Sequence, residues 1–439
     1  NFECMHSGSQ VARFYTSNTL RDQTAWYHFV LAIDTTQGTD TNRMKFYING
    51  IEATMGGQSV ATAYPAQDLD FLWGENSVTH YMGKRSYSVN SNDPSDLYMT
   101  ENYYIDGSAL TPSSFGEEDS VTGEWIPKKY SGSYGNAGYY LNFSDNSNTT
   151  AGTLGADTSG NGNNWTPNNF SVASGGGNDS VTDTPTNNYC TWSPDDKHRD
   201  HISIADGALV PTQTDSGGFA GIKGTMGVTS GKWYFEFTAG GGSGHQIGWV
   251  NSEFNMYDAA DVAITTAGTN GHGAVFDARG FMYGWIGSEA AAWYPDSSST
   301  TTWTNNDVIG CAMDLDNYKF YFSKNGTFIN SQNPVDGTNA IVPTGSNNDG
   351  DGAYVAGDIM QPYFTGWGNG TGQTNFGQQG FTHTPPTGYK ALCSQNLPEP
   401  TIKDPADYYK GKIYSGTGST QTITTGVDAD LVWVKRRDD

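Results

Sequence analysis

Short apolar and aromatic runs, each bounded by Gly, Asn, Asp, Ser or Thr, recur along the whole chain. Runs of this length and composition are typical of β-strands. Asn49-Gly50 and Asn325-Gly326 each follow such a run directly, and Asn-Gly suits the positive φ angles of a tight hairpin turn. The clearest runs are 26–33 (WYHFVLAI), 44–48 (MKFYI), 232–237 (KWYFEF) and 319–322 (KFYF).

No segment has a convincing helical period with caps. Strands at short spacing without intervening helices predict antiparallel packing, so we expect an all-β chain of tandem antiparallel β-sandwiches. At about 150 residues per domain, the 439 residues predict two to four domains. Aromatic residues make up 13% of the chain, which predicts buried cores and excludes a disordered chain.

The charge balance excludes two classes of partner. The chain has 46 Asp and Glu against 22 Lys and Arg, a formal net charge of −24. Binding to nucleic acid needs clustered Lys and Arg, and so does binding to an anionic membrane surface. No apolar run approaches the roughly 20 residues that a membrane span needs. We therefore expect neither nucleic acid nor membrane as a partner.

The four cysteines, Cys4, Cys190, Cys311 and Cys393, lie far apart and form no CxxC pair. This spacing does not support a zinc site and favours free or buried thiols over a disulfide.

Three changes of composition suggest boundaries between modules. Residues 142–169 are rich in Asn, Ser, Thr and Gly, residues 174–188 (SGGGNDSVTDTPTNN) form the best linker candidate, and residues 397–407 contain three prolines. The strand-like run 431–439 (LVWVKRRDD) ends the sequence. We therefore expect a portion of a longer chain, cut inside a further β module.

Four strings of the first part stand out, namely 25–34 (AWYHFVLAID), 43–50 (RMKFYING), 103–116 (YYIDGSALTPSSFG) and 157–165 (DTSGNGNNW). On these strings the first part resembles the concanavalin A-like, laminin G-type jelly roll, in the form found in structural proteins of tailed marine phages. The resemblance covers residues 1–172, and the N-terminal strands expected for such a domain are absent, which indicates truncation.

The second part contains, in order, the strings 230–237 (SGKWYFEF), 247–250 (IGWV), 306–315 (NDVIGCAMDL), 321–326 (YFSKNG), 361–364 (QPYF), 375–378 (NFGQ) and 385–392 (PPTGYKAL). On these strings it resembles a SPRY domain over residues 190–395, after a linker at 173–189. Residues 396–439 would begin a further, truncated β module, because 427–439 (VDADLVWVKRRDD) resembles the opening strand of another jelly roll.

Together these resemblances imply a non-enzymatic virion protein of a tailed phage, either a tail fibre or a surface decoration. SPRY domains mostly bind proteins or peptides, and the concanavalin-like fold often binds sugars. The implied partners are a host surface polysaccharide or protein, other virion proteins and further copies of the chain, with a trimer as one form. The implied location is the virion surface or the extracellular space. A purely structural virion or filament subunit is the alternative, and a polysaccharide depolymerase is a third hypothesis.

The sequence argues against the depolymerase. Glycoside hydrolysis uses a pair of carboxylates, which laminarinase-type members of the fold carry as E-x-D-x-x-E, and no such string occurs. GxSxG and HExxH are also absent. The acidic run 117–119 is typical of a solvated turn, and His198 and His201 fit a charged surface loop better than a metal site. We therefore predict no catalytic residues.

Two acidic loops could hold calcium, the one cofactor that the sequence suggests. Residues 347–358 (NNDGDGAYVAGD) place oxygen ligands close to EF-hand spacing, but without flanking helices and with Asp at the twelfth position. A loop without metal is the alternative reading of each. The candidate ligands are Asn347, Asp349, Asp351 and Asp358 in this loop, and Asp157 and Asn161 in the turn at 157–161.

Sugar binding would need exposed aromatic rings, which offer a broad apolar face to a sugar. The alternative for each ring is packing in a sandwich core, which we expect for Trp233 and Trp249 because they lie in strand-like runs. The candidate ligand-binding residues are Trp285, Trp293, Trp303 and Trp367.

Overall fold

The computed structural model describes the chain except for residues 1, 7–8, 18–19, 23, 56–62, 76–77, 86–92, 95–96, 174–176, 199, 215–219, 242, 255–270, 287–291, 295–300, 344–356, 400 and 436–439. The described residues form antiparallel sheets and a few short 3-10 helices, so the predicted all-β class is confirmed. None of these helices has the length and apolar character of a membrane span.

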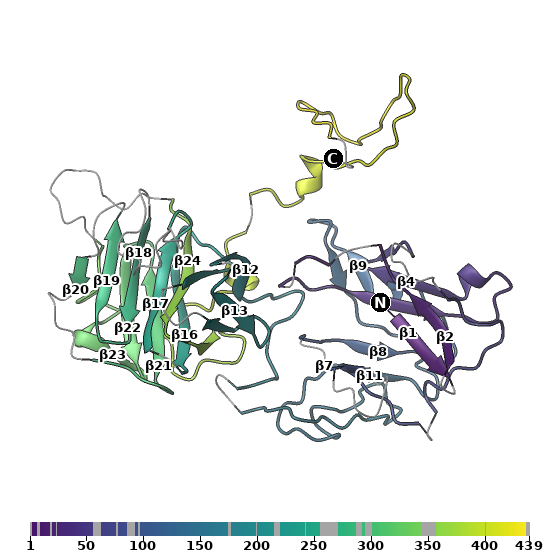
Figure 1. Cartoon of the computed structure of the whole chain (residues 1–439), viewed down its shortest axis with the longest axis horizontal. Helices are drawn as coiled ribbons and strands as arrows, with labels where there is room; N and C mark the ends of the chain where they lie inside the picture. The colour runs from purple at the N-terminus through teal and green to yellow at the C-terminus, as the bar shows by residue number, and fades with distance from the viewer. Residues whose placement is uncertain are drawn as a thin grey trace.

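The N-terminal part contains small sheets arranged in two layers, with β1, β2, β4 and β9 in one layer and β7, β8 and β11 in the other (Figure 1). The sheets are β1-β2, β3-β4-β5, β6-β7, β11-β8 and β10-β9. The strands are β1 Phe2–His6, β2 Ser9–Phe14, β3 Phe29–Ile33, β4 Met44–Ile48, β5 Ile51–Glu52, β6 Lys84–Arg85, β7 Asp93–Pro94, β8 Asn102–Tyr104, β9 Gly116–Glu118, β10 Trp125–Pro127 and β11 Tyr139–Leu141.

The second part is a sandwich of a seven-stranded and a five-stranded antiparallel sheet, with the β13-β14 hairpin beside it. The sheet orders are β12-β15-β24-β17-β18-β19-β20 and β23-β22-β21-β16-β25. The strands are β12 Trp192–Lys197, β13 Ile202–Ala205, β14 Val210–Gln213, β15 Ala220–Gly224, β16 Lys232–Ala239, β17 Ser243–Asn251, β18 His272–Asp277, β19 Met282–Ile286, β20 Ala292–Tyr294, β21 Val308–Asp314, β22 Lys319–Lys324, β23 Thr327–Phe328, β24 Met360–Trp367 and β25 Gly372–Asn375.

Both predicted Asn-Gly turns are confirmed. Asn49 and Gly50 join β4 to β5 with φ angles of 47° and 80°, and Asn325 and Gly326 join β22 to β23 with 48° and 80°. These left-handed angles suit Gly and Asn better than any other residues, and they fix the register of each hairpin.

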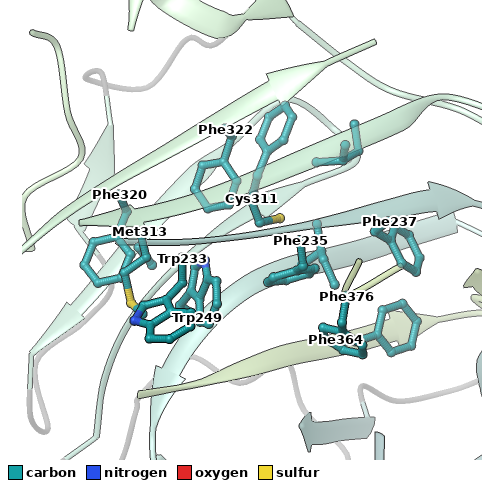
Figure 2. Packing of buried hydrophobic residues seen from close by; sticks show 14 of the residues in the cluster. Trp233, Phe235, Phe237, Trp249, Cys311, Met313, Phe320, Phe322, Phe364 and Phe376 are labelled. Atoms are coloured by element: carbon teal, nitrogen blue, oxygen red, sulfur yellow. The ribbon is translucent and has the colours of Figure 1, made fainter. Parts of the chain in front are cut away.

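The core of the molecule lies between the two sheets of the second part, where large aromatic side chains interdigitate (Figure 2). Trp233 and Trp249 are buried in it, as the sequence predicts. Trp249 meets Phe235 edge to face, with ring centroids 5.0 Å apart. Such pairs add specific geometry to the apolar area that they bury.

Among the described residues of the N-terminal part, Ala12 and Met44 are fully buried and form a small apolar cluster. The residues packed around them, among them Leu31, Ile33 and Phe46, are partly buried. An open cleft lies beside this cluster.

The C-terminal segment, residues 401–435, contains one short 3-10 helix, Pro405–Asp407, and no strand. It projects away from the sheets, as the yellow trace in Figure 1 shows. The described part of the run expected to open a further β module, residues 427–435, pairs with none of the described strands.

Candidate functional site

The structure contains a cleft of about 1840 Å³. Its walls come from β3, β8 and β10 of the N-terminal part and from the β13-β14 turn of the second part. Small-molecule pockets occupy about 300–1,000 Å³, so this cleft has room for a polymer segment.

One wall of the cleft is apolar because of the alternation in β3. Phe29, Leu31 and Ile33 share a face of the strand, and Phe46 of β4 lies directly opposite Leu31. All four line the cleft. Phe29 is 48% exposed, and its ring stacks on that of Phe46 with centroids 5.6 Å apart. Leu31, Ile33 and Phe46 are partly buried against the small cluster of Ala12 and Met44, so Phe29 is the most exposed residue of this wall.

A second aromatic pair continues this wall. The rings of Phe71 and Trp73 stack with centroids 5.8 Å apart, and Trp73 is 39% exposed. The phenol of Tyr104 in β8 donates a hydrogen bond to the carbonyl oxygen of Trp73 at 3.3 Å, which joins this pair to the opposite layer.

The polar part of the lining is acidic. Among the described lining residues, Lys128 is the one Lys or Arg, and its ammonium forms an ion pair with Glu117 at 3.1 Å. Hydrogen bonds from the side chain of Thr36 lower the pKa of Asp34, so this carboxylate is charged at neutral pH. The lining carboxylates are Asp22, Asp34, Asp70, Glu101, Asp106, Glu124 and Asp183.

Glu101 anchors β8 to β11 beneath the cleft. Its Oε2 atom accepts hydrogen bonds from the phenols of Tyr103 at 2.7 Å and Tyr140 at 2.6 Å. The two rings stack with centroids 4.3 Å apart and planes 5° apart. Burial, together with the Glu101 carboxylate, raises the pKa of Tyr140 to about 12, so the phenol keeps its proton and remains a donor. Glu101 has a left-handed φ of 52°, a conformation that an L residue adopts at a cost.

Of the four tryptophans predicted to bind sugar, the structure describes the side chain of Trp303 alone, and this side chain is buried. Trp303 lies in the core, 3% exposed, and its ring packs against Phe237, His245 and Phe276, so it offers no face to a sugar. The expectation fails at this position because these three rings cover the indole. The side chains of Trp285, Trp293 and Trp367 lie outside the described residues. The backbone positions of Trp285 and Trp293 belong to β19 and β20, at one edge of the seven-stranded sheet.

The predicted calcium ligands belong to two separate loops, 347–358 and 157–161. Asn347, Asp349 and Asp351 lie outside the described residues. Asp358 is described, and its Oδ2 atom contacts Nδ1 of His272 at 2.5 Å. This pairing commits one carboxylate oxygen to an imidazole rather than to a cation.

At the other loop, both oxygens of Asp157 already accept hydrogen bonds. Oδ1 receives the backbone N–H groups of Tyr140 at 2.9 Å and Ser159 at 2.8 Å, and Oδ2 receives the Ser159 hydroxyl and the Asn163 N–H. The amide of Asn161 donates to the carbonyl oxygens of Gly135 and Gly138. These contacts describe a turn held by its own chain.

The described residues contain no group of three or more His, Cys, Asp or Glu side chains that could hold a metal ion. His198 and His201 lie close together, with ring centroids 4.6 Å apart. Glu117 lies in β9, and the Asp119 carboxylate accepts the N–H groups of Val121 and Thr122, as in the predicted solvated turn.

The sequence analysis did not single out the apolar wall of the cleft. The sequence does contain a pattern that indicates this wall. Apolar residues alternate in 29–33, which pairs with 44–48, and such alternation predicts one apolar face. Alternation cannot show which residues of this face line a cleft, since that depends on the segments that pack against it.

Comparison with known proteins identifies the second part. Residues 232–344 match the family model of the SPRY domain. Among solved structures, the SPRY domain of human HERC1 is 14% identical, with 42% of this chain and 94% of that chain covered and a TM-score of 0.28. The TRIM65 PSpry domain is 13% identical, with 42% and 88% covered and a TM-score of 0.29. The match to the family model lies within the sandwich described above, and the chain therefore contains a SPRY domain.

Proposed function

We propose that this chain is a non-enzymatic structural and adhesion protein of a tailed-phage virion, a tail fibre or surface decoration that contacts a host surface protein or glycan. The observation that carries the proposal is the SPRY sandwich, in which seven-stranded and five-stranded sheets close over one aromatic core. The ordered laminin G-type strings of the first part support the phage context.

The sandwich is suited to binding because it holds its loops and edge strands on a rigid frame. Its buried charges are satisfied internally and serve structure. Glu236 is 1% exposed and accepts the backbone N–H groups of Thr382 at 2.7 Å and His383 at 2.8 Å. The buried carboxylate of Asp277 is paired with the guanidinium of Arg279 at 2.8 Å.

The recognition surface in this proposal includes the edge of the seven-stranded sheet formed by β19 and β20. These strands carry the positions of Trp285 and Trp293. Tryptophan is enriched among the residues that dominate binding energy at interfaces.

The test is binding of the full chain to host cells and to a panel of bacterial surface polysaccharides, in calcium and then in EDTA. We expect saturable binding that falls at least tenfold in Trp285→Ala and Trp293→Ala. Tyr81→Ala is the matched control, because Tyr81 is 53% exposed and lies in the N-terminal part. Absence of binding to every glycan and to whole cells would overturn the adhesion role.

A second candidate, a structural subunit that contacts only other subunits, is favoured by one observation. The four consecutive residues 431–434 (LVWV) are all more than 60% exposed. An apolar run of this kind is a site for contact with another chain.

A further inference from the structure

We propose that the hydrogen bond between Trp125 and His28 is an acid-sensitive clasp, which holds the β9-β10 hairpin against the cleft and releases it as the pH falls. This inference goes beyond the proposed function, and it does not depend on host binding.

The clasp joins the hairpin to the segment that leads into β3. The indole N–H of Trp125 donates a hydrogen bond to Nδ1 of His28 at 2.9 Å, and the two rings stack with centroids 5.9 Å apart. Both residues line the cleft. The ring of Trp125 also packs against Gly50 and Gly116, where an added Cβ would overlap it. Trp125 therefore fastens the hairpin both to His28 and to the β4-β5 turn.

The direction of this hydrogen bond fixes the protonation state of His28. An indole N–H can only donate, so Nδ1 is an unprotonated acceptor and the ring proton is on Nε2. A second proton would place an N–H of the imidazolium against the N–H of the indole, and the hydrogen bond would be lost. Burial lowers the pKa of His28, which agrees with a neutral imidazole in the closed hairpin.

The elements around His28 offer its imidazole no described charged partner. Its backbone exchanges hydrogen bonds with the uncharged Asn49 of the β4-β5 turn. Glu118, which lies opposite Trp125 in the hairpin, is exposed, and so is Glu124. None of the described hydrogen bonds or ion pairs joins the imidazole to a charged group, so a proton on His28 would not be compensated. The charged residues on the surrounding elements are Asp22, Lys45, Glu52, Glu117, Glu118, Glu124, Lys128 and Asp183, of which Lys45 is paired with Glu52 and Lys128 with Glu117.

The effect of pH follows from linkage. In the released hairpin His28 is solvated and has its ordinary pKa of about 6.5. The clasp therefore has its full strength above pH 6.5 and loses it as the pH falls, so at pH 5 the opening equilibrium of the hairpin rises by at most about thirtyfold. The neighbouring contact between Trp26 and Asp183 responds in the opposite direction, because burial raises the pKa of Asp183. Acid should therefore release the hairpin while the N-terminal part stays attached to the SPRY domain.

The first experiment is hydrogen exchange of the indole N–H groups, followed by NMR on the full chain labelled with ¹⁵N-tryptophan. The exchange rate of Trp433, which is 87% exposed, serves as the reference, so the intrinsic effect of pH cancels. We expect the protection of Trp125, assigned with Trp125→Phe, to fall by up to about thirtyfold between pH 7.5 and pH 5. The buried Trp192 donates to the hydroxyl of Thr374 at 2.9 Å, and this acceptor does not titrate, so the protection of Trp192 should not change.

Variants of His28 separate the clasp from a general effect of acid. His28→Asn keeps an acceptor oxygen near the position of Nδ1 and cannot be protonated, so the protection of Trp125 should be the same at both pH values. His28→Phe removes the acceptor and should give low protection at both. His383→Asn is the matched control and should respond as wild type does, because His383 is a half-buried histidine outside the cleft. Equal losses at Trp125 and Trp192, no effect of pH on Trp125 in wild type, or a pH response that persists in His28→Asn would each overturn the proposal.

Movement of the hairpin itself is measured as the distance between two nitroxide spin labels. Val121 lies in the turn of the hairpin and Ile51 in β5, and they are 53% and 75% exposed, so cysteines at these positions can be labelled in a Cys4→Ser background. The other native cysteines are buried. We expect the distance distribution to lengthen and broaden at pH 5 when His28 is present and to stay unchanged in His28→Asn. A distribution that is the same at pH 7.5 and pH 5 with His28 present would overturn the release of the hairpin.

Discussion

The indole N–H of Trp26 donates a hydrogen bond to Oδ1 of Asp183, at 3.3 Å, across 157 residues of sequence. Trp26 precedes β3 in the N-terminal part, and Asp183 precedes β12 of the sandwich. The same carboxylate oxygen accepts the backbone N–H of Tyr189 at 3.2 Å. Asp183 thus links the N-terminal part to the chain that enters the SPRY domain.

This contact predicts a pH dependence of stability. Burial raises the pKa of Asp183 to about 6, although the hydrogen bonds from Trp26 and Tyr189 act in the opposite direction and lower this pKa. In the unfolded chain the pKa is about 3.9, so between these values the folded state binds more protons. Stability from this group is therefore greatest below pH 4, and it falls as the pH rises through 6, by at most about 3 kcal/mol.

The measurement is denaturant unfolding of wild type and Asp183→Asn between pH 4 and pH 7. Asparagine keeps the acceptor oxygen and cannot ionise, so the variant should gain stability relative to wild type as the pH rises. Trp26→Phe serves as the companion variant, with an expected loss of about 1 kcal/mol from the missing donor. A difference between Asp183→Asn and wild type that does not change with pH would contradict the assignment.

A second prediction concerns the contact between Tyr98 and the β13-β14 turn. Gly207 has a left-handed φ of 62°, and a Cβ there would overlap the ring of Tyr98. Gly207→Ala should therefore cost about 1 kcal/mol for the backbone and a further 1–3 kcal/mol for displacing the ring.

Gly83→Ala provides the matched control for this substitution. Gly83 has a similar φ of 69°, but a Cβ there would meet no atom within 4 Å, so only the backbone cost remains. Thermal unfolding of both variants, of Tyr98→Ala and of the Tyr98→Ala, Gly207→Ala double variant checks the prediction. If the two single effects at Tyr98 and Gly207 simply add, the residues are not coupled through this contact.

The sequence predicts local structure well, because local structure depends on neighbouring residues. The Asn-Gly turns and the buried Trp233 and Trp249 follow from turn chemistry and from their place within aromatic runs. Trp303 is different, since its flanking residues (TTWTN) are typical of a loop and its burial depends on Phe237, His245 and Phe276, which are distant in sequence. The cleft depends on which segments lie beside β3, and no pattern within a strand reports its neighbours.

A third prediction concerns the thiols. Cys190, Cys311 and Cys393 are at most 2% exposed, and burial raises the pKa of Cys190 to about 12. Burial, with the nearby Glu236 carboxylate, also raises the pKa of Cys311. Because the thiolate is the reactive form, these thiols should not react in the native protein. In a Cys4→Ser background, a thiol-specific chromophore should report no free thiol in buffer and three in denaturant. Rapid labelling in buffer would contradict the burial of these groups.

The last prediction separates a structural turn from a calcium site at Asp157. Burial tends to raise the pKa of this carboxyl, but four hydrogen bonds from Tyr140, Ser159 and Asn163 together lower it, so the carboxylate is charged and fully engaged. Asp157→Ala removes the acceptor and leaves these donors unpaired, which should cost about 2–4 kcal/mol. Asp157→Asn keeps the oxygen acceptor at Oδ1 but offers an amide in place of Oδ2, so about half of this loss should remain.

Unfolding in calcium and in EDTA should give the same midpoint for wild type and for both variants, because the turn is held by its own chain. A wild-type midpoint that rises in calcium, with the increase lost in Asp157→Ala, would instead make Asp157 a metal ligand.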